Sequence, residues 1–155
     1  MSDRPHVHEI PIVVGAADID DMDHVNNVVY LRWVQEVALA HWRASAMAEM
    51  QAMLAWVATR HELDYLRAAV IGDALVARTW IGTVDSRRFE RLTEIVRVAD
   101  GAVLLRARTL WLLLNRATGR VTRISPALLA CFPPAPQNEG AGAPHEAVGR
   151  RSTPA

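Results

Sequence analysis

The segment NNVVYLRWVQEVALAHWRASAMAE, residues 26–49, has the composition and spacing of one long buried helix. On a helical wheel its polar side chains fall in one narrow stripe, and most of the remaining circumference is Val, Leu, Ala and Trp. The stripe consists of Arg32, Gln35, Glu36 and Arg43. A helix that is apolar over most of its surface is covered on several sides. The rest of the chain must therefore wrap around it.

The segment after this helix predicts the material that covers it. Residues 55–115 read as four strands, because side chains alternate in character along 75–84 and again along 103–113. Turn signals stand at residues 71–73, 85–86, 100–101 and 117–119. Short connections of this kind join antiparallel neighbours.

The two ends of the chain complete the pattern. Residues 7–14 predict one more strand before the helix. Ser125-Pro126 predicts the start of a short helix, with Ser as N-cap and Pro in the first turn. Residues 133–155 are rich in Pro, Gly and Ala and have no apolar period, so we expect a disordered tail.

This order of elements predicts the fold class α+β, with a curved antiparallel sheet wrapped around one long central helix. Residues 1–132 form the predicted domain. One sheet layer on one helix covers little area, so we expect two such units to pair.

Composition excludes several classes of protein. The chain has 155 residues, with 17 basic residues, all of them Arg, and 17 acidic residues, so its formal net charge is +0. A protein that binds nucleic acid through phosphates has a basic surplus, and we expect no such partner. The single Cys131 excludes a disulfide framework and a Cys-rich zinc site. Neither a signal peptide nor an apolar run of about 18 residues is present, so we expect no membrane span and a cytoplasmic location.

The loop GAADIDDMDHVNN, residues 15–27, holds four carboxylates and one histidine. One interpretation is a solvated loop at a helix start, where Asp is favoured by capping and by the helix dipole. A calcium loop starting at Asp18 fails, because Met22 and Val29 stand where oxygen ligands are needed. An Asp/His transition-metal site, with His6 and His8 nearby in sequence, stays open as an alternative, although we expect none.

A third interpretation of the loop is thioester chemistry. A helix N-terminus offers unpaired backbone N–H groups and a partial positive charge to a developing oxyanion. A carboxylate in the same loop activates water or attacks the carbonyl itself. The sequence has no G-x-S-x-G motif, and its one Cys lies at the far end of the domain, so serine or cysteine hydrolase chemistry finds no support.

The run HVNNVVYLRWVQE, residues 24–36, preceded by Asp18-x-Asp20, resembles the signature of hot-dog-fold thioesterases. It is similar both to 4-hydroxybenzoyl-CoA thioesterase-like bacterial acyl-CoA thioesterases and to plant and bacterial acyl-ACP thioesterases. Residues 62–67, followed by Gly72-Asp73, resemble the second strand and turn of that superfamily, and the resemblance spans residues 7–132.

The resemblance implies a hot-dog fold, a homodimer with active sites at the dimer interface, and hydrolysis of an acyl thioester without a cofactor. It places Asp20 on the catalytic carboxylate, as general base or nucleophile, and the backbone N–H of Asn27 on the oxyanion donor. His24 and Glu36 match positions implicated in the acyl-ACP branch.

Three positions depart from the family pattern. Asp23 replaces the usual Gly before the histidine, which removes backbone freedom where the loop meets substrate. Met22 stands where the acyl-ACP branch has Asn, and Gln35 stands where many bacterial relatives have Glu. Asp20 is intact, while the residues that would assist it differ.

Other candidates have two interpretations each. Tyr30 either binds substrate or belongs to the core of the helix, and Arg60 and His61 either line the site or decorate a strand. Arg87 and Arg88, together with Arg91, either bind the phosphates of coenzyme A or form a solvated edge. We also expect one helix residue to be a hydrogen-bonded structural histidine, namely His41.

The leading hypothesis is a cytoplasmic acyl-CoA thioesterase of fatty acid metabolism, a homodimer or a homotetramer. The alternatives are an acyl-ACP thioesterase, a non-catalytic acyl-thioester binding module, and dehydration of a 3-hydroxyacyl thioester. The identity and length of the acyl group are not readable from the sequence.

Overall fold

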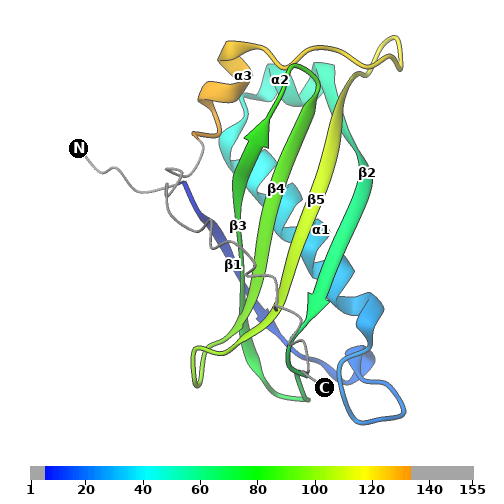
Figure 1. Ribbon diagram of the computed structural model, residues 1–155, viewed down its shortest axis with the longest axis vertical. Coiled ribbons are helices and arrows are strands. Elements are labelled where there is room, and N and C mark those ends of the chain that lie inside the picture. The colour runs from blue at the N-terminus through cyan, green and yellow to red at the C-terminus, as the bar shows by residue number, and fades with distance from the viewer. Residues whose placement is uncertain (1–5, 134–155) are drawn as a thin grey trace, which may run out of the picture.

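The computed structural model describes residues 6–133, so the predicted tail at 133–155 lies outside the described residues apart from its first position. A five-stranded antiparallel sheet lies across one long helix (Figure 1). The elements are β1 (His8–Val13), η1 (Ala16–Asp18), α1 (Asn27–Ser45), α2 (Ala48–Met53), β2 (Leu54–Tyr65), β3 (Ala74–Val84), β4 (Arg88–Arg97), β5 (Val103–Asn115) and α3 (Pro126–Ala130). The α+β architecture and the order of elements expected from the sequence are confirmed.

The strand order in the sheet is β1-β3-β4-β5-β2, and every neighbouring pair is antiparallel. Strands β3, β4 and β5 follow one another through short turns, whereas β1 and β2 form the two edges. Buried and less buried positions alternate along most of the three central strands; the exceptions are Leu104, which is buried beside Leu105, and Thr83, which is exposed. This alternation turns one face of the sheet toward α1, as period-2 patterning requires.

The predicted single helix over residues 26–49 is wrong at its C-terminal end. Helix α1 ends at Ser45, and the extended backbone of Ala46 leads into the separate helix α2. The side-chain amide of Gln51 donates to the carbonyls of Ala46, at 2.8 Å, and of Arg43, at 3.2 Å. These bonds satisfy carbonyls that the end of a helix leaves without partners, so the chain can turn toward β2 there.

The core divides into two clusters along α1. The cluster near the N-terminal half of the helix is mainly aliphatic, with Tyr30 and Trp33 packed against residues of β1, β3 and β5. The cluster near the C-terminal half is rich in aromatic side chains and includes residues of α3. Its rings belong to Trp42, Trp56, Phe89, Trp111 and Phe132. The two halves of the helix therefore lie in different surroundings.

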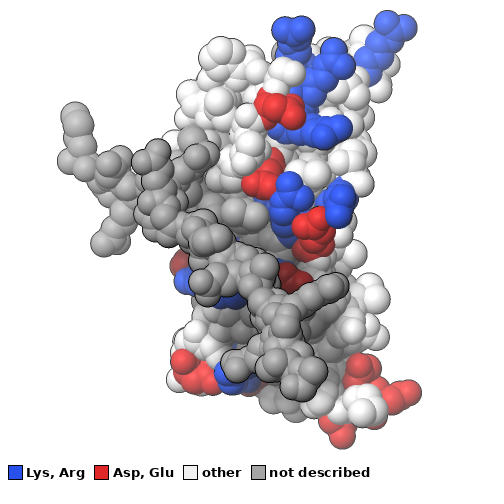
Figure 2. Space-filling model, in the orientation of Figure 1, with Lys and Arg blue, Asp and Glu red and all other residues white. Residues whose placement is uncertain are grey.

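The outer face of the sheet carries ion pairs between strands. Glu94 of β4 pairs with Arg78 of β3 and, at 3.2 Å, with Arg106 of β5. Glu90 of β4 pairs with Arg108 of β5. Acidic and basic side chains accordingly alternate across this face in Figure 2. None of the helices within the described part of the chain is long and apolar enough to cross a membrane.

Candidate active site

The loop before α1 forms a tight turn in which residues 21–24 are exposed and Asp20 is half-buried. Ile19 and Val25 pair in an antiparallel bridge at the base of the turn. Within it, the N–H of Asp20 donates to the carbonyl of His24 at 2.8 Å, and the N–H of Asp23 donates to the carbonyl of Asp20 at 3.1 Å. The backbone of the turn is therefore fixed by its own hydrogen bonds.

Asp23 occupies the one position of this turn with a left-handed backbone, at φ 59°. Glycine adopts this conformation without steric cost, and Asp is among the few other residues that tolerate it. Asp23 therefore adopts the left-handed backbone that a glycine would supply at this position of the turn.

Two carboxylates of this loop, Asp18 and Asp20, have different surroundings. Asp18 is 8% exposed. It accepts the N–H of Gly15 at 3.0 Å and Nη2 of Arg32 at 2.7 Å. The Gly15 hydrogen bond, followed by Arg32, lowers the pKa of Asp18 below its ordinary value. Asp18 is therefore a fixed anion that ties the loop to α1.

Asp20 is half-buried, and one of its oxygens, Oδ1, accepts the N–H of Met22 at 2.9 Å. Among residues 6–133 no arginine or histidine forms an ion pair with it. One hydrogen bond orients the carboxylate and leaves lone pairs free. Asp20 is thus the carboxylate of this turn that is both oriented and available to a proton.

The N-terminus of α1 has one free backbone donor beside this turn. The side chain of Asn26 caps the helix by accepting the N–H of Val28 at 3.0 Å, and the carbonyl of Asn26 accepts the N–H of Val29 at 2.9 Å. Within the described residues, the N–H of Asn27 has no hydrogen-bond partner. A free N–H at a helix start is suited to bind an oxyanion.

The predicted assisting residues His24 and Glu36 are both exposed. His24 lies on the same turn as Asp20. Glu36 lies on α1 and pairs with Arg32 at 3.4 Å, so the Arg32 guanidinium joins it to Asp18. The structure gives neither side chain a contact with Asp20.

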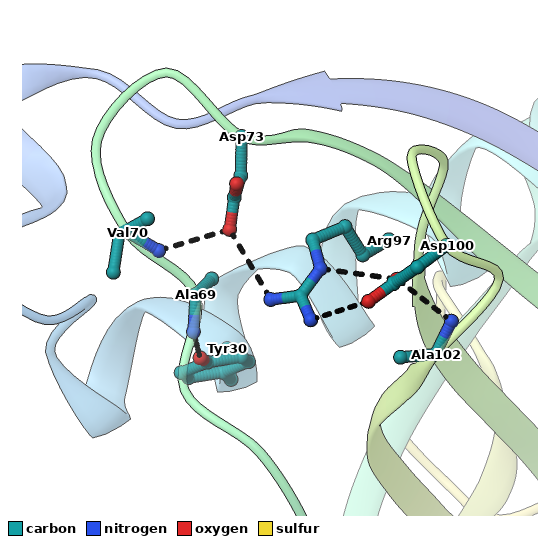
Figure 3. Close-up of polar contacts among 7 residues, drawn as sticks. All are labelled: Tyr30, Ala69, Val70, Asp73, Arg97, Asp100 and Ala102. Atoms are coloured by element: carbon teal, nitrogen blue, oxygen red, sulfur yellow. Dashed lines mark hydrogen bonds and ion pairs between the residues drawn. The ribbon is translucent and has the colours of Figure 1, made fainter.

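Tyr30 belongs to the hydrophobic core. Its position favours a structural role for this side chain over a role in substrate binding. It is 2% exposed, and its hydroxyl accepts the N–H of Ala69 at 2.9 Å. The carbonyl of Ala69 in turn accepts the N–H of Val25 at 3.0 Å. Tyr30 thus anchors the connection between β2 and β3, which itself supports the loop before α1 (Figure 3).

Further polar contacts fix the same connection (Figure 3). Asp73 accepts the N–H of Val70 at 3.0 Å and lies 3.8 Å from Arg97. Arg97 also pairs with Asp100, whose Oδ1 accepts the N–H of Ala102. Two turns at one end of the sheet are therefore held together beside the N-terminus of α1.

Arg60 and His61 lie in the middle of β2, away from the turn. Arg60 is exposed and pairs with Glu62 at 2.7 Å. Nδ1 of His61 is 2.9 Å from the hydroxyl of Thr109, and burial lowers the pKa of His61. Within one chain the structure gives neither residue a contact with Asp20.

Arg87 and Arg88 lie at the turn between β3 and β4, where Oδ1 of Asp85 accepts both of their backbone N–H groups. This turn is at the opposite end of the sheet from the loop before α1 (Figure 1). One chain therefore does not bring these arginines to Asp20. The grouping of Arg91 with them is wrong, because Arg91 is 5% exposed and points inward from β4.

A cavity of about 310 Å³, which was not predicted from the sequence, lies between the C-terminal half of α1 and strands β2, β4 and β5. Its walls are mostly aromatic and aliphatic. The lining residues are Gln35, Ala38, Leu39, Trp42, Ala55, Trp56, Phe89, Arg91, Trp111 and Arg116. The signal available in the sequence was an arginine at an inward position of an alternating strand, between Phe89 and Thr93.

The alternative of an Asp/His metal site receives no support from the geometry. Within the part of the chain that the structure describes, no group of three or more His, Cys, Asp or Glu side chains is placed to hold a metal ion. His6 and His8 instead stack on His41, each with ring centroids 5.1 Å from it.

Comparison with known families gives a match to the Thioesterase-like superfamily over residues 14–132. A palmitoyl-acyl carrier protein thioesterase of Gossypium hirsutum chloroplasts is 28% identical over 100 residues, which are 59% of this chain and 24% of that protein. An acyl-[acyl-carrier-protein] hydrolase of Cuphea viscosissima chloroplasts is 28% identical over 71 residues, 46% of this chain and 17% of that protein. The chain spans less than a quarter of the length of these relatives.

Solved structures share the fold. A 1,4-dihydroxy-2-naphthoyl-CoA thioesterase from Synechocystis has a TM-score of 0.70 at 17% identity, covering 81% of this chain and 94% of that one. A thioesterase from Thermus thermophilus, solved with coenzyme A and Zn, has a TM-score of 0.71 at 18% identity, covering 81% of this chain and 90% of that one.

Proposed function

The chain belongs to the thioesterase-like superfamily and has the hot-dog fold, and we propose that it is an acyl-CoA thioesterase. The reaction is hydrolysis of an acyl thioester to a free carboxylic acid and coenzyme A. One observation carries this proposal: two suitable groups occur together at the start of α1. The carboxylate of Asp20 is oriented and has no ion-pair partner among the described residues, and the N–H of Asn27 has no hydrogen-bond partner among them.

The chemistry assigned to this pair needs no cofactor. Water attacks the thioester carbonyl while Asp20 accepts its proton as general base. The N–H of Asn27 binds the oxygen that becomes negative in the tetrahedral intermediate. The intermediate collapses with cleavage of the C–S bond, and the thiolate leaves and takes up a proton. In the second form of the mechanism, Asp20 attacks the carbonyl itself and water then hydrolyses the resulting anhydride.

An acyl-carrier-protein thioester is the alternative substrate. The two curated relatives act on acyl carrier protein by name, and His24 and Glu36 occupy positions that resemble that branch. Acyl-CoA is preferred here because the two arginines at the β3–β4 turn offer exposed guanidinium groups to phosphates. A non-catalytic binding module is disfavoured, since Asp23 has the left-handed backbone, at φ 59°, that a glycine would supply in this turn.

The proposal includes a homodimer joined at the free edge of β2, with a homotetramer as the larger alternative. Strand β1, the other edge, contains Pro11, which cannot donate to a further strand, whereas the 12 residues of β2 include no proline. Long free edges are templates for pairing. Antiparallel pairing through β2 would bring the β3–β4 turn of the second copy to the end that holds Asp20, so each site would use both copies. The cytoplasm is the proposed location.

The test is release of free thiol from short, long and aromatic acyl-CoA substrates by the wild type, Asp20→Asn and Asp23→Asn. Loss of a general base costs about 10²–10⁴-fold in rate, so we expect Asp20→Asn to lose at least a hundredfold in kcat. Asp23→Asn removes a carboxylate from the same turn and suits its left-handed backbone, so it is the matched control and should keep activity.

Unchanged turnover by Asp20→Asn would contradict the assignment of Asp20. Release from acyl carrier protein thioesters but from no acyl-CoA would establish the alternative substrate. An equal loss in both variants would mean that charge in the loop, rather than one carboxylate, controls the rate.

A further inference from the structure

Arg91 is a buried cation at a position where the strand pattern calls for an apolar residue. The inward side chains of β4 are Phe89, Arg91, Thr93 and Ile95, and all four are buried. Arg91 is 5% exposed. Removing a charge from water is costly unless a partner compensates for it, so its surroundings need an explanation.

The residues that the structure describes give Arg91 only neutral partners. Its Nη1 donates to Nδ1 of His41 at 2.8 Å and to the hydroxyl of Thr79 at 3.3 Å, and its guanidinium carbon lies 6.0 Å from the centre of the Phe89 ring. Burial and the nearby Arg91 charge lower the pKa of His41 to about 3, so His41 is uncharged at neutral pH. Among residues 6–133, no carboxylate pairs with Arg91.

The remaining hydrogen-bonding capacity of Arg91 belongs to the cavity described above. Arg91 lines this cavity, and its Nε and Nη2 donate to no residue of the described chain. The other charged residue in the lining is also an arginine, Arg116, and the lining contains no Asp or Glu. The lining therefore carries positive charge, from Arg91 and Arg116, and no negative charge.

We propose that this cavity binds the far end of the acyl group, and that this end carries a carboxylate that pairs with Arg91. The substrate class is then a coenzyme A thioester of a dicarboxylic acid, with its free carboxylate on Arg91 and its hydrocarbon or aromatic spacer between the tryptophan walls. This inference rests on the proposed thioesterase function and specifies its substrate. Arg91 is a specificity-determining residue in it and takes no part in the hydrolysis itself.

The position of the cavity along α1 agrees with this assignment. Gln35, at the near end of the cavity lining, follows Asn27 by eight residues, which is about 12 Å along a helix axis. A thioester carbonyl held at Asn27 would thus be separated from the cavity by the length of a spacer. Trp42, Trp56 and Trp111 line the space that this spacer would occupy, and the burial of Arg91 would strengthen the ion pair at its end.

The first experiment compares kcat/KM for the CoA thioesters of a dicarboxylic acid and of the monocarboxylic acid with the same number of carbons. We expect the wild type to prefer the dicarboxylic substrate at least tenfold. The monocarboxylic substrate has no free carboxylate, so it cannot form the charge-assisted hydrogen bond with Arg91. Arg91→Met removes the cation and should reverse the preference. Arg91→Lys keeps the positive charge but loses the planar fork of the guanidinium group. This variant should retain part of the preference for the dicarboxylic substrate.

Either of two results overturns the inference. One is an equal kcat/KM of the wild type for the two substrates, and the other is an equal loss of kcat/KM on both substrates in Arg91→Met. Thermal unfolding shows whether Arg91→Met is folded. Met replaces the buried cation with an apolar side chain and removes the cost of keeping a charge out of water, so we expect a folded variant.

A binding experiment separates this inference from the proposed function. The full chain carrying Asp20→Asn is titrated with the free dicarboxylic acid, and tryptophan fluorescence reports occupation of the cavity. Saturable binding that is lost in Asp20→Asn/Arg91→Met supports the cavity assignment even if no thioester is hydrolysed. Hydrolysis of acyl-CoA together with absence of dicarboxylate binding overturns the cavity assignment and leaves the thioesterase proposal in place.

Discussion

The polar groups at the two ends of α1 differ in their exposure to solvent. At the N-terminal end, Asp20 and the N–H of Asn27 lie on an open turn that backbone hydrogen bonds hold in place. At the C-terminal half, Arg91 and His41 are buried among aromatic rings, and the hydrogen-bond partners that the described residues give Arg91 are neutral. A group that exchanges protons with water is here held in place by the backbone, whereas a group suited to recognise charge gains strength from its burial.

The largest stability effect expected from this contrast is a loss of stability in acid that originates at the buried end. The pKa of His41 is lowered from 6.5 to about 3, so the unfolded chain takes up a proton below pH 6.5 while the folded chain does not. This contribution is complete above pH 6.5 and falls as the pH drops toward 3. At pH 5 the loss amounts to about 2 kcal/mol of unfolding free energy.

Urea denaturation at pH 7.5 and pH 5 of the wild type, His41→Gln and His24→Gln measures this loss. Gln can accept from Arg91 and donate to His6 without titrating, so His41→Gln should lose less stability in acid than the wild type. His24→Gln changes the exposed histidine at the other end and should follow the wild type. Equal losses in all three proteins would mean that the buried network is not the source.

The next largest effect on stability is expected from Tyr30, which anchors the connection between β2 and β3 near the N-terminal end of α1. Tyr30→Phe leaves the N–H of Ala69, a residue that is 0% exposed, without its 2.9 Å partner. We expect a loss of about 1 kcal/mol in the free energy of unfolding, measured by urea denaturation. Tyr65→Phe is the matched control, because its hydroxyl donates to the carbonyl of Asn27 in an exposed bond, and its effect should be smaller. A larger loss in Tyr65→Phe would place the anchor elsewhere.

The smallest effect is expected in the turn itself. Asp23→Gly relieves the cost of φ 59° but increases the freedom of the unfolded chain, so stability should rise by only a few tenths of a kcal/mol. Asp23→Val places a β-branched residue in the same conformation and should lower stability clearly. Thermal unfolding of both variants measures the difference. Similar melting temperatures would show that the turn does not require its left-handed residue.

Much of the fold could be predicted because it follows from local patterns. Alternation in residues 75–84 and 103–113 predicted the inward faces of β3 and β5, and the glycines at 72, 101 and 119 have the positive φ of the predicted turns. Ser125 caps α3 by accepting the N–H of Leu128, as its position before a proline predicted. The predicted role of His41, a hydrogen-bonded structural histidine, is confirmed.

The parts that could not be predicted depend on contacts distant in sequence. The end of α1 at Ser45 is set by Gln51, which belongs to the next helix. The inward position of Arg91 was masked by its sequence neighbours Arg87 and Arg88, which lie at an exposed turn. In the candidate site, motif spacing predicted that Asp20 and Asn27 lie on one loop, but the difference between Asp18 and Asp20 depends on Arg32 of α1. Charge pattern alone does not distinguish two aspartates in one loop.

The ion pairs on the outer face of the sheet have a consequence for how the strands find their register. A slip by one residue turns every apolar side chain of a strand outward, so alternation alone prevents it. A slip by two residues keeps the apolar face inward, and alternation does not oppose it. Such a slip separates Arg78 from Glu94, which pair across β3 and β4 only in the observed register. The ion pairs of the outer face therefore favour the observed register over one shifted by two residues, which the apolar pattern of the inner face does not exclude.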